Sequence, residues 1–287
     1  MDTFNDIDLN ECIFGYQDES HCNINENKMR IYYPLERRNI RYKSRKRITT
    51  SIMGYQSVNG QSILYFPKRS VTYYFMNFLL RVLIANIDNP NIVSRLIDII
   101  NDDYHSEEST IAYLKERNSE EQMNQFKNNY IEYMRYTNGK EPTPKQIERK
   151  IKSYKKKINP KDKNVVLKLR ALRLLILVKN DEELMQALIN EKPIVMALDN
   201  CRMHTSTFTL SFAECLNIDL RFLPKYSPQF NPIEQIWRSI KREISYNVIE
   251  NKKELHKIIC KHYMDIIHKK SYYENWIQKY TKHKSFF

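Results

Sequence analysis

Short apolar stretches separated by turn-forming residues occupy much of the first 66 residues, which is the pattern of β-strands. Residues 12–18 (CIFGYQD) predict a short buried strand that follows a polar start. Residues 48–56 and 61–66 predict two further strands. The Asn59-Gly60 pair between them is a strong hairpin signal. The N-terminal part of the chain is therefore expected to form three strands.

A helix is predicted over residues 72–87, because apolar side chains recur there at the spacing of one helical face. Residues 88–192 differ in character. They are polar and highly charged, with helical patterning only in patches. We interpret this segment as an inserted, mostly helical module.

The pattern of a buried core returns at residues 194–199, where an apolar run ending in an aspartate predicts a strand. Beyond it, Pro232 suits the first turn of a helix and Asn231 is expected to be its N-cap. The remaining predicted elements are a helix at about 205–216, a strand at 219–222, and helices at about 232–246 and 252–268.

Three strands, a helix, an insertion and then strand, helix, strand, helix is the order of elements in an RNase H-like fold. We therefore predict an α/β protein with an RNase H-like mixed sheet flanked by helices and carrying a large helical insertion. The predicted divisions are 1–87 for the first part of the core, 88–192 for the basic insertion, 193–250 for the second part, and 251–287 for a C-terminal helical tail.

The chain of 287 residues has a formal net charge of +13, which favours a polyanionic partner, with nucleic acid ahead of an anionic membrane. Its five cysteines form no CxxC pair, and Cys201 with His204 is a lone C-x2-H, so no structural zinc site is predicted. The N-terminus is polar rather than a signal peptide, and no apolar run reaches the length of a bilayer span. A cytoplasmic protein associated with the nucleoid is expected.

Two basic stretches, 37–47 and 150–173, are candidates for contacts with the DNA backbone. Such contacts give affinity that depends on salt but not on sequence. Tyr42 and Tyr154 lie within these stretches, where they would either stack on bases or pack internally. A lysine run is also often only a solvated helix face. The residues predicted to bind DNA are Arg37, Arg38, Arg41, Lys43, Arg45, Lys46, Arg47, Lys155, Lys156 and Lys157.

The strings LDNCRMH (198–204) and LPKYSPQFNPIEQIW (223–237) place Asp199 after a buried strand and Glu234 at the start of a helix. Together they resemble the C-terminal half of the catalytic domain of mariner-superfamily DDE transposases, and more narrowly the prokaryotic insertion-sequence branch. The resemblance implies that Asp199 and Glu234 are the last two acids of the triad. The first acid lies on the first strand in that family. Adjacent strand residues face opposite sides, so Asp18 and its neighbour Glu19 cannot both face the metals. We choose Asp18, because residues 13–16 lead directly into it, and Glu19 stays the alternative.

Cleavage of a phosphodiester needs an activated oxygen nucleophile and a stabilised leaving oxygen, and two Mg²⁺ ions about 3.5–4 Å apart supply both. Such ions prefer carboxylate oxygens. The resemblance therefore implies two Mg²⁺ (or Mn²⁺) ions at the triad, cleavage of the element's ends, and strand transfer into target DNA. Residues expected to support the site are Asn200, His204, Tyr226, Ser227 and Asn231, and Trp237 is predicted to lie in the core.

Family members carry helix-turn-helix modules ahead of the catalytic domain, whereas about eleven residues precede the first predicted strand here. A separately encoded end-recognition module, or recognition through the insertion, is therefore expected, with a homodimer acting on DNA. Lys225 also departs from the family, which often has proline there. Two rival interpretations remain: an RNase H-like nuclease without strand transfer, and an inactive DNA-binding remnant of a transposase.

Overall fold

The computed structural model describes residues 4, 6–25, 45–225, 227–275 and 277. The chain divides into two compact units: Met1–Leu96 together with Val178–Phe287, and Ile97–Leu177. The second unit falls inside the segment 88–192 that the sequence pattern set apart. The predicted domain boundaries themselves stay a prediction. Among the helices of the described ranges, none is long and apolar enough to cross a membrane.

The first unit is built on a mixed sheet, which in the described residues has five strands in the order β3-β2-β1-β4-β5. β1 pairs antiparallel with β2 and parallel with β4, while β3 and β5 form the edges. This arrangement confirms the predicted α/β fold of RNase H-like type. The strands are β1 (Ile13–Asn23), β2 (Thr49–Ser57), β3 (Ile63–Tyr65), β4 (Ile194–Leu198) and β5 (Ile218–Phe222).

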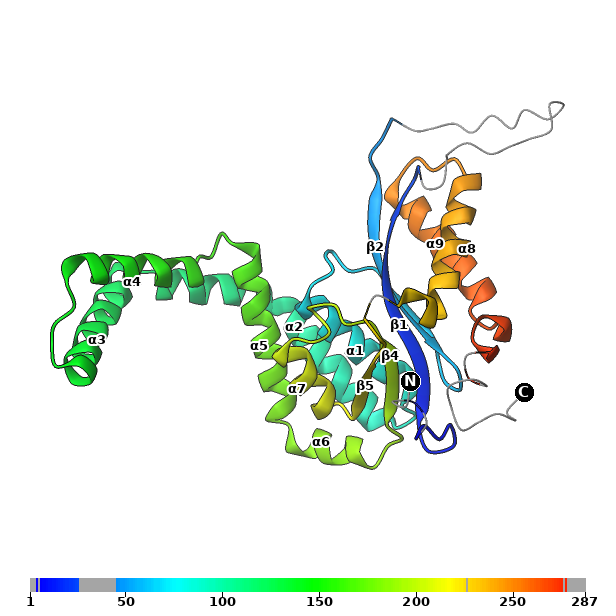
Figure 1. Ribbon diagram of the computed structural model, residues 1–287, viewed down its shortest axis with the longest axis horizontal. Helices are drawn as coiled ribbons and strands as arrows, with labels where there is room; N and C mark the ends of the chain where they lie inside the picture. The colour runs from blue at the N-terminus through cyan, green and yellow to red at the C-terminus, as the bar shows by residue number, and fades with distance from the viewer. Residues whose placement is uncertain (1–3, 5, 26–44, 226, 276, 278–287) are drawn as a thin grey trace. The chain divides into compact units, whose positions relative to one another are not determined.

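Helices cover both faces of this sheet (Figure 1). α8 (Ile233–Tyr246) and α9 (Lys252–Ile266) lie on one face, and α1 (Thr72–Asn86) and α7 (Thr207–Cys215) lie on the other. Side chains alternate along a strand, so Phe14 and Tyr16 of β1 join the buried cluster formed with α8 and α9. The short helix α6 (Glu182–Ile189) precedes β4.

The amphipathic pattern of α8 explains why this helix packs where it does. Ile233, Ile236, Trp237, Ile240 and Ile244 recur at helical spacing and are all buried. Glu234 belongs to the first turn and is only partly buried. The apolar stripe therefore holds α8 on the sheet and fixes the side on which Glu234 emerges.

β1 is longer than the predicted strand 12–18, and the difference matters for the site. Its first residues pair with both neighbours, but the parallel pairing with β4 is recorded only from Ile13↔Ile194 to Tyr16↔Ala197. The polar half of β1 continues along β2 alone, out to Asn23↔Thr49. Antiparallel pairing with β2 thus extends β1 through residues whose polarity is typical of a loop.

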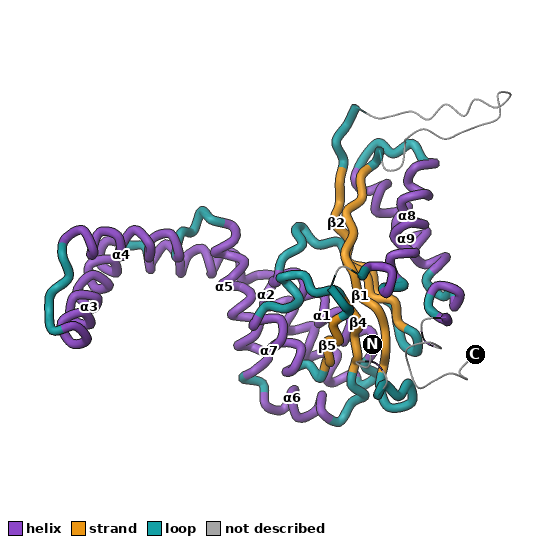
Figure 2. Tube along the Cα trace, in the orientation of Figure 1, coloured by secondary structure: helices purple, strands orange, loops and turns teal. Residues whose placement is uncertain are grey.

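The second unit is a set of helices with well-formed ends. It contains α3 (Glu120–Asn138), α4 (Pro144–Lys157), and parts of α2 (Pro90–Arg117) and α5 (Lys163–Lys179) (Figure 2). Thr143 begins α4 with a capping box that uses Gln146. Gly139 ends α3 in the left-handed conformation that glycine adopts at low cost.

Aromatic stacking and hydrogen bonds hold these helices together. The rings of Phe126 on α3 and Tyr154 on α4 stack with centroids 3.9 Å apart, and Arg117 donates to the Tyr154 hydroxyl at 3.2 Å. Tyr154 therefore packs within this unit, as one of the two roles considered for it requires. Arg170 on α5 is buried and donates to the backbone oxygen of Asp103, whose side chain is 1% exposed.

Candidate active site

The parallel register of β1 and β4 brings two acids to the same place. Tyr16 is level with Ala197 in this ladder. Two residues further along each strand are Asp18 and Asp199, so the register sets them side by side where the parallel pairing stops. The carboxyl ends of parallel strands are the usual location of sites in α/β sheets.

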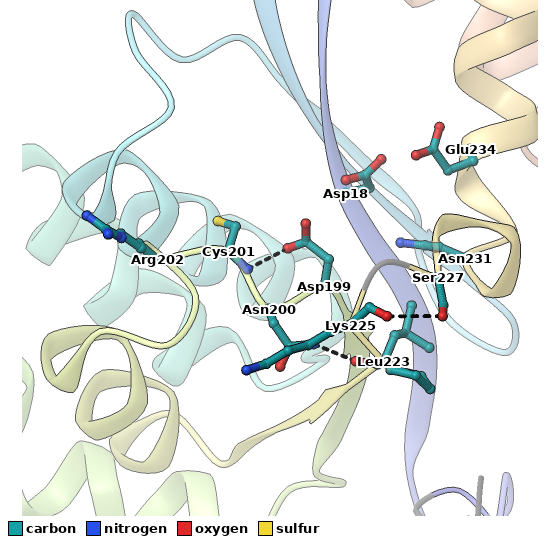
Figure 3. Close-up of a pocket in the computed structure, with 11 residues that line it drawn as sticks. Asp18, Asp199, Asn200, Cys201, Arg202, Leu223, Lys225, Ser227, Asn231 and Glu234 are labelled. Carbon is teal, nitrogen blue, oxygen red and sulfur yellow. Dashed lines mark hydrogen bonds between the residues drawn. The ribbon is translucent and has the colours of Figure 1, made fainter.

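Asp18, Asp199 and Glu234 all line one cavity of about 670 Å³. In Figure 3 their carboxylates point toward a common space between β1, the loop after β4, and α8. Two basic residues, Arg202 and Lys225, line the same cavity. The other lining residues are Asn200, Cys201, Leu223, Pro224, Ser227 and Asn231.

Asp18 is held from the side of α8. The indole Nε1 of Trp237 donates to its Oδ2 at 2.9 Å. Burial, followed by the negative charges of Glu19 and Glu234, raises the pKa of Asp18 well above its usual value. A cation bound beside this carboxyl group would lower its pKa again.

Trp237 reaches Asp18 across a position on β2 that has no side chain. Gly54 is the residue paired with Asp18 in the β1–β2 ladder. A Cβ added at Gly54 would lie 2.4 Å from Cη2 of Trp237 and 2.9 Å from its Cζ2. Glycine is therefore required for the indole ring to approach β2 this closely.

Asp199 is held from the loop that follows β4. Its Oδ1 accepts from the backbone N–H of Cys201 at 3.0 Å and from Nδ1 of His204 at 2.8 Å. The hydrogen bond from His204 is the main cause that lowers the pKa of Asp199. Within the described chain, Oδ2 of Asp199 makes no recorded hydrogen bond, and in Figure 3 it is the oxygen directed into the cavity.

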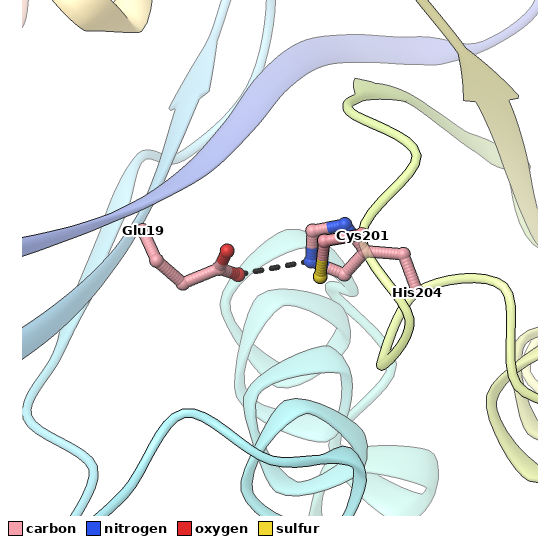
Figure 4. A group of neighbouring side chains, drawn as sticks. All are labelled: Glu19, Cys201 and His204. Atoms are coloured by element: carbon pink, nitrogen blue, oxygen red, sulfur yellow. Dashed lines mark hydrogen bonds and ion pairs between the residues drawn. The ribbon is translucent and has the colours of Figure 1, made fainter. Parts of the chain in front are cut away.

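The ring of His204 is fully buried and lies between two carboxylates. While Nδ1 faces Asp199, Nε2 lies 3.0 Å from Oε1 of Glu19 (Figure 4). Burial alone would lower the pKa of His204, but hydrogen bonds to Asp199, Cys201 and Glu19 outweigh it and raise the pKa to about 12. Cys201 also lies close enough for its Sγ to sit within 4.8 Å of ligand atoms of Glu19 and His204.

Most of the predicted supporting residues donate hydrogen bonds to backbone carbonyl oxygens. Asn231 is not the N-cap of α8, as the sequence suggested: Pro232 occupies that position without a side-chain cap. The Asn231 side chain instead donates to the carbonyl oxygen of Gln17 at 2.8 Å, which ties the start of α8 to β1 beside Asp18. Because Pro232 rather than Asn231 is the N-cap, the side-chain amide of Asn231 is available for this contact with β1.

The two loops that flank the cavity are also tied. Asn200 donates to the carbonyl oxygen of Leu223, which joins the loop after β4 to the loop after β5. Ser227 donates to the carbonyl oxygen of Lys225 at 3.2 Å. Tyr226 lies outside the described residues.

The residues predicted to bind DNA fall into three groups. Arg45, Lys46 and Arg47 are exposed just before β2, and Lys46 donates to the carbonyl oxygen of Glu250 at 3.1 Å. The lysines 155–157 are exposed in the last turn of α4. The four remaining positions, Arg37, Arg38, Arg41 and Lys43, lie outside the described residues.

Residues 179–256 match the family model of the DDE superfamily endonucleases. The matched segment includes Asp199 and Glu234, and it supports a DDE-type transposase or endonuclease domain in this part of the chain. Enzymes of this superfamily act on DNA and generally use divalent metal ions. A comparison with curated proteins found no match to the chain.

Sequence reasoning missed the roles of Trp237, Gly54 and Glu19. Trp237 was predicted to be core, and it is buried, but its N–H also donates to Asp18. The spacing of three residues after Glu234 is the signal that could have revealed it. No sequence signal links Gly54 to Trp237, because the pair meets only through the sheet.

Proposed function

We propose that this chain is the catalytic domain of a DNA transposase in which Asp18, Asp199 and Glu234 form a DDE triad. The observation that carries the proposal is the common cavity lined by these three carboxylates, which come from β1, the end of β4 and α8. The superfamily match covers two of them and not Asp18. The position of Asp18 beside Asp199 in the parallel register supplies independent support for the first acid.

The donor set fits divalent cations. Three carboxylates face one space, and burial, followed by the negative charges of Glu19 and Glu234, raises the pKa of Asp18. Oxygen ligands of this kind suit Mg²⁺ or Mn²⁺, and carboxylates bind such ions in their deprotonated form. When bound, two such ions would supply Lewis-acid polarisation of the scissile phosphate and an activated oxygen nucleophile.

The chain's own residues orient the reaction. Trp237 and the Cys201 N–H each occupy one carboxylate oxygen, so Asp18 and Asp199 are held in fixed rotamers. Arg202 and Lys225 line the cavity as cations, where they would contact the non-bridging oxygens of a phosphate. In strand transfer, the 3′-hydroxyl freed by cleavage attacks target DNA by the same in-line displacement.

DNA contacts outside the cavity are proposed for the basic stretches. Residues 145–168 contain ten lysines and arginines against two acids, whereas residues 97–144 contain five against ten. Charge of opposite sign is thus separated within one unit, which general lysine enrichment does not produce. Arg45 and Arg47, the lysines 155–157, and the undescribed arginines of 37–41 are the proposed backbone contacts, and a homodimer would bring one site to each element end.

The test is Asp199→Asn with Asp265→Asn, an exposed α9 position, as the matched control. Asp199→Asn is expected to lower metal-dependent nicking of supercoiled DNA at least about 1,000-fold, since removal of one member of a catalytic set costs this much or more. DNA affinity should be unchanged. Nicking at the level of the control would overturn the assignment.

A pre-cleaved oligonucleotide end, incubated with a target plasmid, separates transposition from simple hydrolysis. Covalent joining of the oligonucleotide to the plasmid is the expected result. Hydrolysis without joining would identify an RNase H-like nuclease instead. DNA binding with neither reaction would identify an inactive remnant.

A further inference from the structure

The two adjacent acids of β1 point to opposite faces of the sheet and have different partners. Asp18 turns toward α8, where Trp237 contacts it. Glu19 turns toward the side of α1 and contacts His204, whose ring also lies 4.4 Å from that of Phe75. The pleat alone produces this division, so only Asp18 lines the cavity with Asp199 and Glu234.

Glu19 is itself fixed. Its Oε1 accepts from Nε2 of His204 at 3.0 Å and from Nε2 of Gln17 at 2.6 Å, and its side chain is 15% exposed. A buried carboxylate that receives two donors at one oxygen has little rotational freedom. It therefore gives His204 an anchor on β1.

His204, held by Glu19, in turn contacts Asp199. Its Nδ1 lies 2.8 Å from Oδ1 of Asp199 and 3.2 Å from the Asp199 carbonyl oxygen. Since Oδ1 is occupied by His204 and Cys201, the carboxylate is turned so that Oδ2 faces the cavity. The chain of contacts joins β1 to the loop after β4 on the face opposite Trp237.

We propose that Glu19 is a positioning residue that acts through His204 to hold Asp199 with Oδ2 directed at the metal-binding cavity. We call Glu19, His204 and Asp199 the carboxylate brace. This inference rests on the proposed function, and it deepens it by giving the two neighbouring acids of β1 separate tasks. Asp18 binds metal, and Glu19 orients a ligand that binds metal.

Two variants at Glu19 distinguish the effect of side-chain length from the effect of charge. Glu19→Gln keeps Oε1 in place to accept from His204 and Gln17, so Mn²⁺ affinity and nicking should stay within roughly fivefold of wild type. Glu19→Asp keeps the charge but withdraws the oxygens by one methylene. It should lower both quantities roughly 10- to 100-fold, the usual effect of losing the partner of a metal-ligating group.

Mn²⁺ affinity, measured by electron paramagnetic resonance on the full chain without DNA, gives a readout that does not depend on turnover. Glu19→Ala should behave like Glu19→Asp, and combining it with His204→Ala should cause no further loss, because both changes break one brace. Glu214→Ala, an exposed glutamate on α7, is the matched control. Thermal unfolding of each variant checks that the fold is retained.

Two results would overturn the brace. Wild-type Mn²⁺ affinity in folded Glu19→Asp and Glu19→Ala would mean that Asp199 needs no anchor. Loss of Mn²⁺ binding in Glu19→Gln equal to that in Asp18→Asn would make Glu19 a metal ligand. Failure of the proposed function looks different: Asp199→Asn would then leave both Mn²⁺ affinity and nicking unchanged.

Discussion

The cavity at the end of β4 and the basic stretch of α4 both concentrate charge, but they hold it in opposite ways. Around the cavity, two of the three acids are held by defined partners: Trp237 for Asp18, and Cys201 and His204 for Asp199. On α4, the lysines 155–157 are exposed and have no recorded ion pair among the described residues. The cavity depends on the exact positions of its charged groups, whereas the basic stretch depends on how many charges it carries. Single substitutions should therefore have severe effects at the cavity and mild, additive effects on α4.

Burial, rather than location in one unit or the other, should decide the size of the effect. Arg170 lies in the same basic stretch as the exposed lysines, yet it is buried against Asp103, which is 1% exposed. Arg170→Ala should lower the free energy of unfolding of the second unit by about 3–5 kcal/mol, because it leaves a buried charge without its partner.

Urea denaturation together with hydrogen exchange of α2 and α5 measures this loss, and Lys168→Ala, an exposed change two residues away, is the control. A loss below about 1 kcal/mol, the size expected for an exposed pair, would show that the Arg170–Asp103 contact is no different from the surface charges.

The next largest effect is expected at Gly54. Gly54→Ala places a methyl group 2.4 Å from the Trp237 ring, so we expect a loss of about 1–3 kcal/mol from overpacking. Nicking should also fall because Trp237 is pushed away from Asp18. Adding Trp237→Phe should recover part of the lost stability, since the smaller ring avoids the methyl group. Strict additivity of the two changes in a double-mutant cycle would contradict this explanation.

Trp237→Phe alone tests the hydrogen bond to Asp18. The ring stays apolar and packed, but the N–H donor is lost. A hydrogen bond to a charged group is worth about 1.5–3 kcal/mol, so nicking should fall roughly 10- to 100-fold. Steady-state nicking rates at saturating Mg²⁺ measure the change. Unaltered rates would mean that Asp18 is positioned by the strand alone.

The smallest single effects are expected on α4. Each of Lys155→Ala, Lys156→Ala and Lys157→Ala should weaken DNA binding uniformly across sequences and reduce the slope of log affinity against log salt by about 1. The triple variant should show the sum. Lys127→Ala, an exposed lysine on α3, serves as the control. A triple variant with an unchanged salt slope would show that α4 is only a solvated face.

The sequence predicts the elements well where periodicity is strong, as in α1, α8 and α9, because one buried face repeats at a fixed interval. It fails for the second half of β1, since most residues from Glu19 to Asn23 are polar and their pairing with β2 is a long-range contact. The fold class was predicted from the order of the elements. That order stays the same when the predicted ends of individual elements are inaccurate.

At the site, residues that belong to a continuous motif could be predicted from the sequence, whereas contacts between distant segments could not. Asp199 and Glu234 stand in a long motif, so their positions could be read directly. Asn231 looked like a helix cap because Asn before Pro fits that rule, but the partner it uses is a backbone oxygen more than 200 residues away. The link from Glu19 to His204 spans 185 residues and has no local signature.

The parallel pairing of β1 with β4 also dictates when the cavity comes into being. Ile13 and Ile194 are ladder partners, and at synthesis rates of about 5–20 residues per second they leave the ribosome roughly 9–36 s apart. During that interval β1 has β2 on one side and an open edge on the other, which is a template for pairing with another chain. A nascent chain therefore lacks the complete cavity, and it is prone to aggregate until β4 has emerged and paired with β1.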